Sequence, residues 1–108
     1  MQISIRLAEK ATILDVAGNI DLQSSPAMRK ALLDNLKIAS CVIVNLKGVP
    51  YIDSSGIASL VEGLKASHDR KNRLVLIGLS RMAHQVLDLT RLTPLFEIHE
   101  TEEQALQG

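Results

Sequence analysis

Short apolar runs alternate with stretches of helical periodicity along most of this chain, and this alternation constrains the fold more than any other feature. Apolar runs rich in β-branched residues predict buried strands at residues 41–46 and 74–78, and a last short strand is predicted at residues 96–99. Between the first two, the apolar residues of 57–64 follow i, i+3, i+4, i+7 spacing, which is typical of an amphipathic helix. Strands separated by helices need crossover connections, so these strands are expected to pair in parallel.

Two more strands are predicted at the N-terminus. Ile3, Ile5 and Leu7 alternate with polar residues, which predicts a half-buried strand with one solvated face. Residues 12–17 form a second strand-like run after a short link, so the two are expected to form an antiparallel hairpin. We therefore predict an α/β fold in which a mixed sheet and about four helices follow one another in the order ββαβαβαβα.

The helix boundaries follow from capping signals. Ser24, Ser25 and Pro26 predict a helix start with a serine at the cap, and that helix is expected to end near residue 39. The second helix is expected to end near residue 70, Ser80 to cap the third, and residues 101–104 to form a capping box for the fourth. The predicted core-facing helix side chains are Met28, Ala31, Leu32, Leu36, Leu60, Val61, Leu64, Met82, Val86 and Leu89.

Length and charge exclude several classes of protein. At 108 residues the chain is predicted to be a single domain, spanning 1–108. Twelve basic and twelve acidic residues are interspersed, which argues against nucleic-acid and membrane-surface binding. No signal peptide or membrane-spanning run is recognisable, so a cytoplasmic protein is expected. The single cysteine, Cys41, is predicted to be a buried structural thiol.

The segment Asp53-Ser54-Ser55-Gly56 lies where a predicted strand gives way to a helix. One interpretation is structural, because Ser and Asp are ordinary N-cap residues. The other is functional, because a helix N-terminus accepts an added phosphate, two serines exceed what one cap needs, and Gly56 leaves room beside Ser55. The carboxyl end of a strand is also where parallel α/β sheets place functional groups.

A catalytic role for Ser54 or Ser55 is the competing interpretation. A hydrolase elbow of the form G-x-S-x-G is missing, since Ser55 follows Asp53 and Ser54. The three histidines are widely spaced, and none is predicted to lie beside Ser55 or to complete a metal set with the lone cysteine. No phosphate-binding loop of the G-x-x-x-x-G-K-[ST] kind occurs either. We therefore expect neither an enzyme nor a cofactor or metal site.

The signature 53–60, which reads Asp-Ser-Ser-Gly-Ile-Ala-Ser-Leu after a strand, resembles that of the STAS domain. More closely, the chain resembles the bacterial anti-sigma factor antagonists. The likeness extends over nearly the whole chain, including segments 18–21, 45–46 and 92–96. This resemblance implies a STAS-like fold and a regulator that binds an anti-sigma factor, itself a serine kinase, and so releases the sigma factor.

The resemblance also implies roles for individual residues. Ser55 corresponds to the serine that the kinase phosphorylates to end binding, and a phosphatase of the PP2C type would restore the active form. Asp21, Asp53, Ser54, Ser55 and Gly56 are the expected partner-binding residues. The segment after Asp21 departs modestly from the family pattern, which leaves the partner's identity open. STAS domains also serve stress signalling, secretion and transport regulation, so a partner-switching role in another pathway remains the alternative.

Overall fold

The computed structural model describes residues 1–107, and its elements follow the predicted order ββαβαβαβα. The strands are β1 (Gln2–Leu7), β2 (Thr12–Ala17), β3 (Cys41–Gly48), β4 (Arg73–Ile77) and β5 (Glu97–His99). The helices are α1 (Ser25–Ile38), α2 (Ser54–Arg70), α3 (Arg81–Leu89) and α4 (Glu102–Gln107), with a 3-10 turn at Thr93–Leu95.

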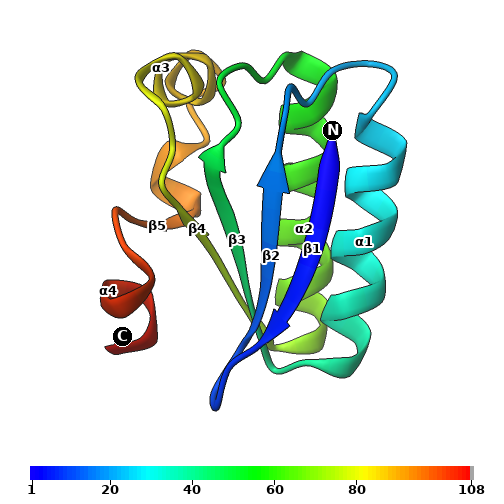
Figure 1. The fold of residues 1–108 in the computed structure, drawn as a ribbon, viewed down its shortest axis with the longest axis vertical. Helices are drawn as coiled ribbons and strands as arrows, with labels where there is room; N and C mark the ends of the chain where they lie inside the picture. Colours follow the sequence, from blue (N-terminus) through cyan, green and yellow to red (C-terminus); the bar gives the residue numbers. More distant parts are fainter. Residues whose placement is uncertain (108) are drawn as a thin grey trace.

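The five strands form one mixed sheet in the order β1-β2-β3-β4-β5 (Figure 1). β1 is antiparallel to β2, and the remaining neighbours are parallel, as the hairpin and the crossover connections predict. Because β3 is central and parallel to β2 and β4, the carboxyl ends of these three strands lie together at one end of the sheet. The chain between that end and α2 carries the Asp53–Gly56 segment.

Helices cover the sheet on both faces, which explains why the central strands read as continuous apolar runs. α1 and α2 pack side by side against one face, where Leu14, Val44 and Leu76 belong to the main core (Figure 1). On the other face α4 covers a smaller cluster that includes Ile43 and Cys41. The prediction that Cys41 is buried is confirmed, and burial raises the pKa of its thiol.

The prediction of a half-buried first strand is wrong for most of β1. Ile3 packs against the main core, but Ile5 and Leu7 are 55% and 85% exposed. β1 is the edge strand of the sheet, whereas α1 contacts β3 and α2 contacts β4. The layer formed by α1 and α2 therefore does not cover Ile5 and Leu7. The alternation in the sequence correctly predicts a strand here, but it does not predict how deeply that strand is buried.

The core-facing residues of α3 were also partly misassigned by the sequence pattern. Ala83 and Leu87 are buried, whereas Met82 is 49% exposed and Leu89 is 84% exposed. Val86, also predicted to face the core, is partly buried against it, so α3 packs through a narrow stripe and the residues on either side of this stripe are exposed. In the longer helices, Met28, Leu32, Leu36, Leu60 and Leu64 are buried as predicted, with Ala31 and Val61 partly so.

Most capping predictions are confirmed by hydrogen bonds. The Ser80 hydroxyl accepts the N–H of Ala83 at 3.0 Å, and Thr101 and Gln104 satisfy each other's backbone N–H groups at 3.2 and 3.3 Å. Ser24 occupies the N-cap position of α1 but makes no side-chain cap bond, since its hydroxyl accepts the N–H of Asp21 at 2.9 Å instead.

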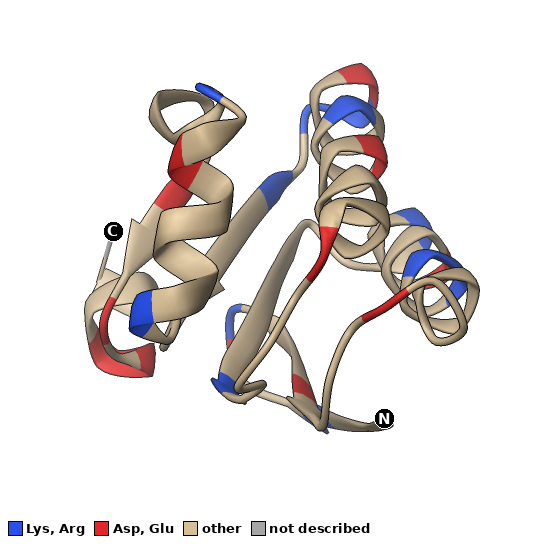
Figure 2. Cartoon of the chain, turned by 90° about the horizontal axis from the view of Figure 1, so that it is seen from above, with Lys and Arg blue, Asp and Glu red and all other residues tan. Residues whose placement is uncertain are grey.

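Basic and acidic residues are interspersed along the helices, as the blue and red segments of the ribbon in Figure 2 show. Many of them pair across elements, as Arg29 does with Glu62 and Arg73 with Glu97. Within residues 1–107, no helix is both long enough and apolar enough to cross a lipid bilayer.

Candidate functional site

α2 begins with an aspartate cap that also holds a serine hydroxyl. Oδ1 of Asp53 accepts the backbone N–H groups of Ser55 and Gly56 at 2.9 and 3.0 Å. The same oxygen accepts the hydroxyl of Ser55 at 2.5 Å. These donors stabilise the carboxylate and lower the pKa of Asp53, with the Ser55 hydroxyl contributing most. Asp53 is therefore the residue that caps α2, and neither serine is needed as the cap.

The two serines differ in their surroundings. Ser54 is exposed at the first position of α2, whereas Ser55 is half-buried and its hydroxyl is oriented by Asp53. The Ser55 side chain therefore has a defined position at the end of the sheet, while its neighbour faces solvent.

A main-chain bridge joins this segment to the loop that carries Asp21. The N–H of Ile20 donates to the carbonyl of Tyr51 at 3.0 Å, and the N–H of Asp53 donates to the carbonyl of Ile20 at 3.1 Å. Asp21 follows directly and accepts the N–H groups of Gln23 and Ser24. The structure thus brings Asp21 into the loop beside Asp53, together with the other predicted site residues.

Gly56 is required for close packing at the start of α2. A Cβ atom at this position would lie 2.5 Å from Cγ1 of Ile52 and 2.8 Å from Cγ2 of Ile20. Both isoleucines are fully buried and belong to the bridge between the two loops. The glycine therefore lets the first turn of α2 approach that bridge closely, which the sequence argument did not foresee.

Ser55 also lines a shallow depression of about 360 Å³ between α1 and α2. Beneath it, the buried hydroxyl of Ser59 donates to the carbonyls of Ser25 and Ser55 at 3.1 and 3.2 Å, which ties the starts of the two helices together. Farther along, Arg29 pairs with Glu62 across the same depression. Sequence analysis missed these residues, although i, i+4 spacing places Ser59 on the same helix face as Ser55.

Two apolar side chains flank the motif and are exposed. Leu22, next to Asp21, is 75% exposed, and Tyr51, two residues before Asp53, is 41% exposed. Tyr51 is the only tyrosine of the chain. Exposed aromatic and aliphatic side chains beside polar groups are typical of protein-binding surfaces, so both extend the candidate site beyond the residues predicted from sequence.

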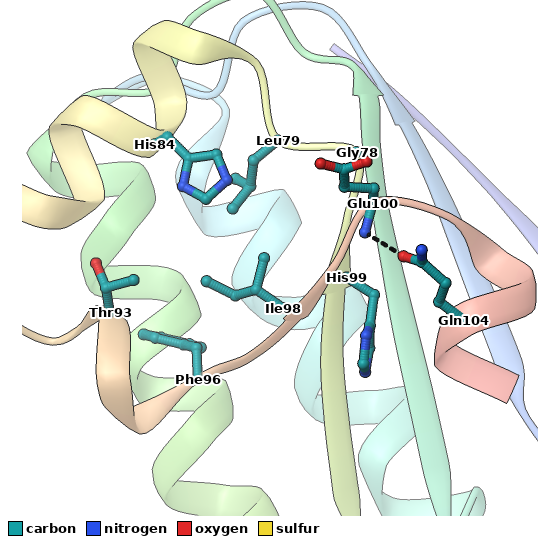
Figure 3. Close-up of a pocket in the computed structure, with 9 residues that line it drawn as sticks. All are labelled: Gly78, Leu79, His84, Thr93, Phe96, Ile98, His99, Glu100 and Gln104. Carbon is teal, nitrogen blue, oxygen red and sulfur yellow. Dashed lines mark hydrogen bonds between the residues drawn. The ribbon is translucent and has the colours of Figure 1, made fainter. Parts of the chain in front are cut away.

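The histidines lie elsewhere. His84 and His99 line a cavity of about 780 Å³ formed by α3, β5, α4 and the turns around them, to which the α2 start contributes no residue (Figure 3). His99 is also bonded to Glu97 at 2.9 Å, and His68 is in the last turn of α2, at the opposite end from Ser55. Among the described residues, Ser55 has an aspartate partner and no histidine, an arrangement that gives no support to a serine hydrolase.

The family model for the STAS domain matches residues 2–105. The chain belongs to the STAS domain family.

Several known proteins are similar to this chain along most of their length. An anti-sigma-B factor antagonist of Listeria monocytogenes is 33% identical over 106 residues, covering 94% of this chain and 93% of that protein. An anti-sigma factor antagonist from Mycobacterium paratuberculosis has the same fold, with a TM-score of 0.86 at 17% identity over 98% of this chain and 91% of the other. Unphosphorylated SpoIIAA, another anti-sigma factor antagonist, superimposes with a TM-score of 0.81 at 18% identity, over 97% and 93%.

Proposed function

We propose that this STAS domain is an anti-sigma factor antagonist that acts by partner switching under the control of phosphorylation at Ser55. In its unphosphorylated form it binds an anti-sigma factor that is also a serine kinase, and it thereby releases the sigma factor. Phosphorylation of Ser55 abolishes this binding, and a PP2C-type phosphatase restores it. The protein acts as a single domain in the cytoplasm, through proteins rather than through nucleic acid or membrane, and it catalyses no reaction itself.

The hydrogen bond between the Ser55 hydroxyl and Asp53 is the observation that carries this proposal. It distinguishes Ser55 from Ser54 by placing the Ser55 hydroxyl in a defined position beside a carboxylate, at the partly exposed start of a helix. The similarity to the Listeria antagonist supports the class of partner. The fold is also shared with SpoIIAA, which has been solved in a phosphorylated form.

The expected effect of the phosphate is electrostatic and local. Phosphorylation adds about −1.5 to −2 charges and three acceptor oxygens. At a helix N-terminus these charges are tolerated by the helix dipole, so the fold persists. At the binding surface they lie near the carboxylates of Asp53 and Asp21, where they add bulk and like charge. Partner binding is therefore lost without unfolding.

The partner-binding surface consists of Asp21, Asp53, Ser54, Ser55 and Gly56, and it extends to Leu22 and Tyr51. The apolar pair supplies area that leaves water on binding, while the acidic residues set the charge that the partner must match. Because the main-chain bridge fixes the two loops relative to each other, little ordering entropy is lost when the partner binds.

The decisive experiment combines the protein with ATP and candidate anti-sigma kinases from the same cell and locates phosphate by mass spectrometry. We expect one phosphate at Ser55, none in Ser55→Ala, and normal incorporation in the matched control Ser54→Ala. Kinase binding should be lost in the phosphorylated protein and in Ser55→Asp, while both keep the circular dichroism of the folded protein. Phosphate at another residue, or gross unfolding of Ser55→Asp, would contradict the proposal.

A further inference from the structure

The outer edge of β1 has features of a strand that pairs with another strand. β1 is at the end of the sheet, and its six residues contain no proline, glycine or lysine. Exposed edges in natural proteins are usually shortened, bulged or charged to prevent association. The opposite edge follows that rule, since β5 has only three residues, of which Glu97 is ion-paired with Arg73 and bonded to His99.

The pairing of β1 with β2 determines which backbone groups point outward. The N–H of Ala8 donates to the carbonyl of Ala11, so this facing pair is of the hydrogen-bonded type. Hydrogen-bonded and non-hydrogen-bonded pairs alternate along an antiparallel ladder. With Leu7 opposite Thr12 and Ile5 opposite Leu14, the backbone groups of Ile3, Ile5 and Leu7 are the ones that point away from β2.

The same three residues carry the apolar side chains of the strand. Ile5 and Leu7 are exposed on the α1 side of the sheet, beyond the part that α1 covers, and Ile38 at the end of α1 adds a further exposed side chain beside Leu7. The one charged residue of β1, Arg6, forms ion pairs with Asp15 and with Glu102, the latter at 2.7 Å. The edge therefore combines free backbone groups and apolar side chains with a charge that is neutralised within the chain.

We propose that β1 pairs antiparallel with β1 of a second copy of this chain, so that the two sheets become one continuous sheet. Placing the two-fold axis at Ile5 brings Ile5 opposite its own copy and Ile3 opposite Leu7, so all the outward backbone groups of these residues find partners. In this register Arg6 faces Ser4 of the other copy, and no like charges oppose each other. A shift of the axis to Arg6 would set two guanidinium groups against each other.

This arrangement has two structural consequences. The two-fold axis is perpendicular to the sheet, so both α1 helices lie on the same face and flank a strip formed by Ile5, Leu7 and Ile38 of both copies. Because the β1 strands run in opposite directions, the two Ser55 sites lie at opposite ends of the joined sheet. Dimer formation therefore leaves both sites accessible.

A single strand pair forms a small interface, so the dimer is weak, with a dissociation constant on the order of 10 µM or above. Sedimentation velocity tests this dimer, because the dimer fraction must rise with protein concentration over about a hundredfold range around that value. The wild type is expected to shift from monomer to dimer. Ile5→Pro, which removes an outward N–H but none that bonds β2, should weaken association at least about tenfold.

If circular dichroism shows that Ile5→Pro does not fold, Ile5→Lys tests the same contact, because it sets two positive charges opposite each other at the two-fold axis. Leu89→Lys is the matched control, because it also places a charge at an exposed leucine but on α3; it should associate like the wild type. Amide exchange followed by NMR should slow with concentration at Ile3, Ile5 and Leu7. A wild type that stays monomeric over the whole range, or a dimer that persists in folded Ile5 variants, would overturn the proposal.

Discussion

The hydroxyl of Ser55 and the N-terminal amides of α2 share one acceptor, Oδ1 of Asp53. The proposed phosphorylation of Ser55 would therefore act on the helix cap as well as on the proposed binding surface. A phosphoserine at this position loses its hydroxyl donor and places an anion beside the capping carboxylate. The phosphate also offers acceptor oxygens to the same amides, so a cap can be retained while the surface changes its charge.

Asp53→Ala should destabilise the fold moderately by removing this cap, because N–H groups of the first turn of α2 lose their acceptor. We expect the melting temperature to fall by about 4 °C, and by less in Asp53→Asn, whose side-chain oxygen still accepts a hydrogen bond. Circular dichroism melts provide the measurement. Asp34→Ala on the exposed face of α1 is the control, and equal losses in both alanine variants would contradict the capping role.

Gly56→Ala should destabilise the protein although alanine favours helices. Its methyl group would meet Ile52 and Ile20 at distances that require these buried side chains or the helix to move. We expect a loss of about 1 to 3 kcal/mol in the free energy of unfolding, measured with urea. Ser54→Ala in the same turn, where the side chain is exposed, should change it by less than about 0.5 kcal/mol. A gain in stability for Gly56→Ala would show that the packing is looser than described.

Ser59→Ala should loosen the contact between the starts of α1 and α2. The buried hydroxyl joins the carbonyls of Ser25 and Ser55, and its removal is expected to cost about 1 kcal/mol in the free energy of unfolding. Amide exchange should become faster in the first turns of both helices. If exchange rises only around residue 59 itself, the hydroxyl does not link the two helices.

At acid pH the protein should lose the contribution that Glu97 makes to the free energy of unfolding. Arg73 holds the pKa of this carboxyl below its ordinary value of 4.5, so the folded state binds fewer protons than the unfolded state as the pH approaches that value. The contribution, about 0.5 kcal/mol after solvent screening, is present above pH 4.5 and is lost as the pH falls through the lowered pKa. Urea denaturation of Glu97→Gln should therefore show a flatter dependence on pH below 4.5 than the wild type. Parallel curves would exclude this linkage.

The order of elements and the location of the motif could be predicted from sequence because each depends on local patterns. Period-two and period-3.6 spacing identify strands and helices, and caps such as Ser80 and Thr101 mark helix ends by short-range hydrogen bonds. The strand-to-helix position of Ser55 follows from the same local signals.

Burial at the edges could not be predicted in the same way, because it depends on which element lies opposite. The alternation in β1 is correct, yet Ile5 is exposed since the helix layer does not extend over the edge strand. Met82 likewise fits a helical stripe but falls outside the narrow contact of α3. The need for glycine at position 56 and the hydrogen-bond partner of Ser59 on α1 both depend on segments that are distant in sequence, and no local pattern encodes such contacts.

The main-chain bridge between Ile20 and Ile52 has a consequence for how such regulators diversify. Its hydrogen bonds involve only backbone atoms, so Leu22 and Tyr51 can be exchanged without displacing Asp53 or Ser55. Under the proposed function, recognition of a particular partner and the phosphorylation of Ser55 therefore depend on separate parts of one surface. Side chains around the serine could then differ between such proteins in one cell, so that each binds its own partner.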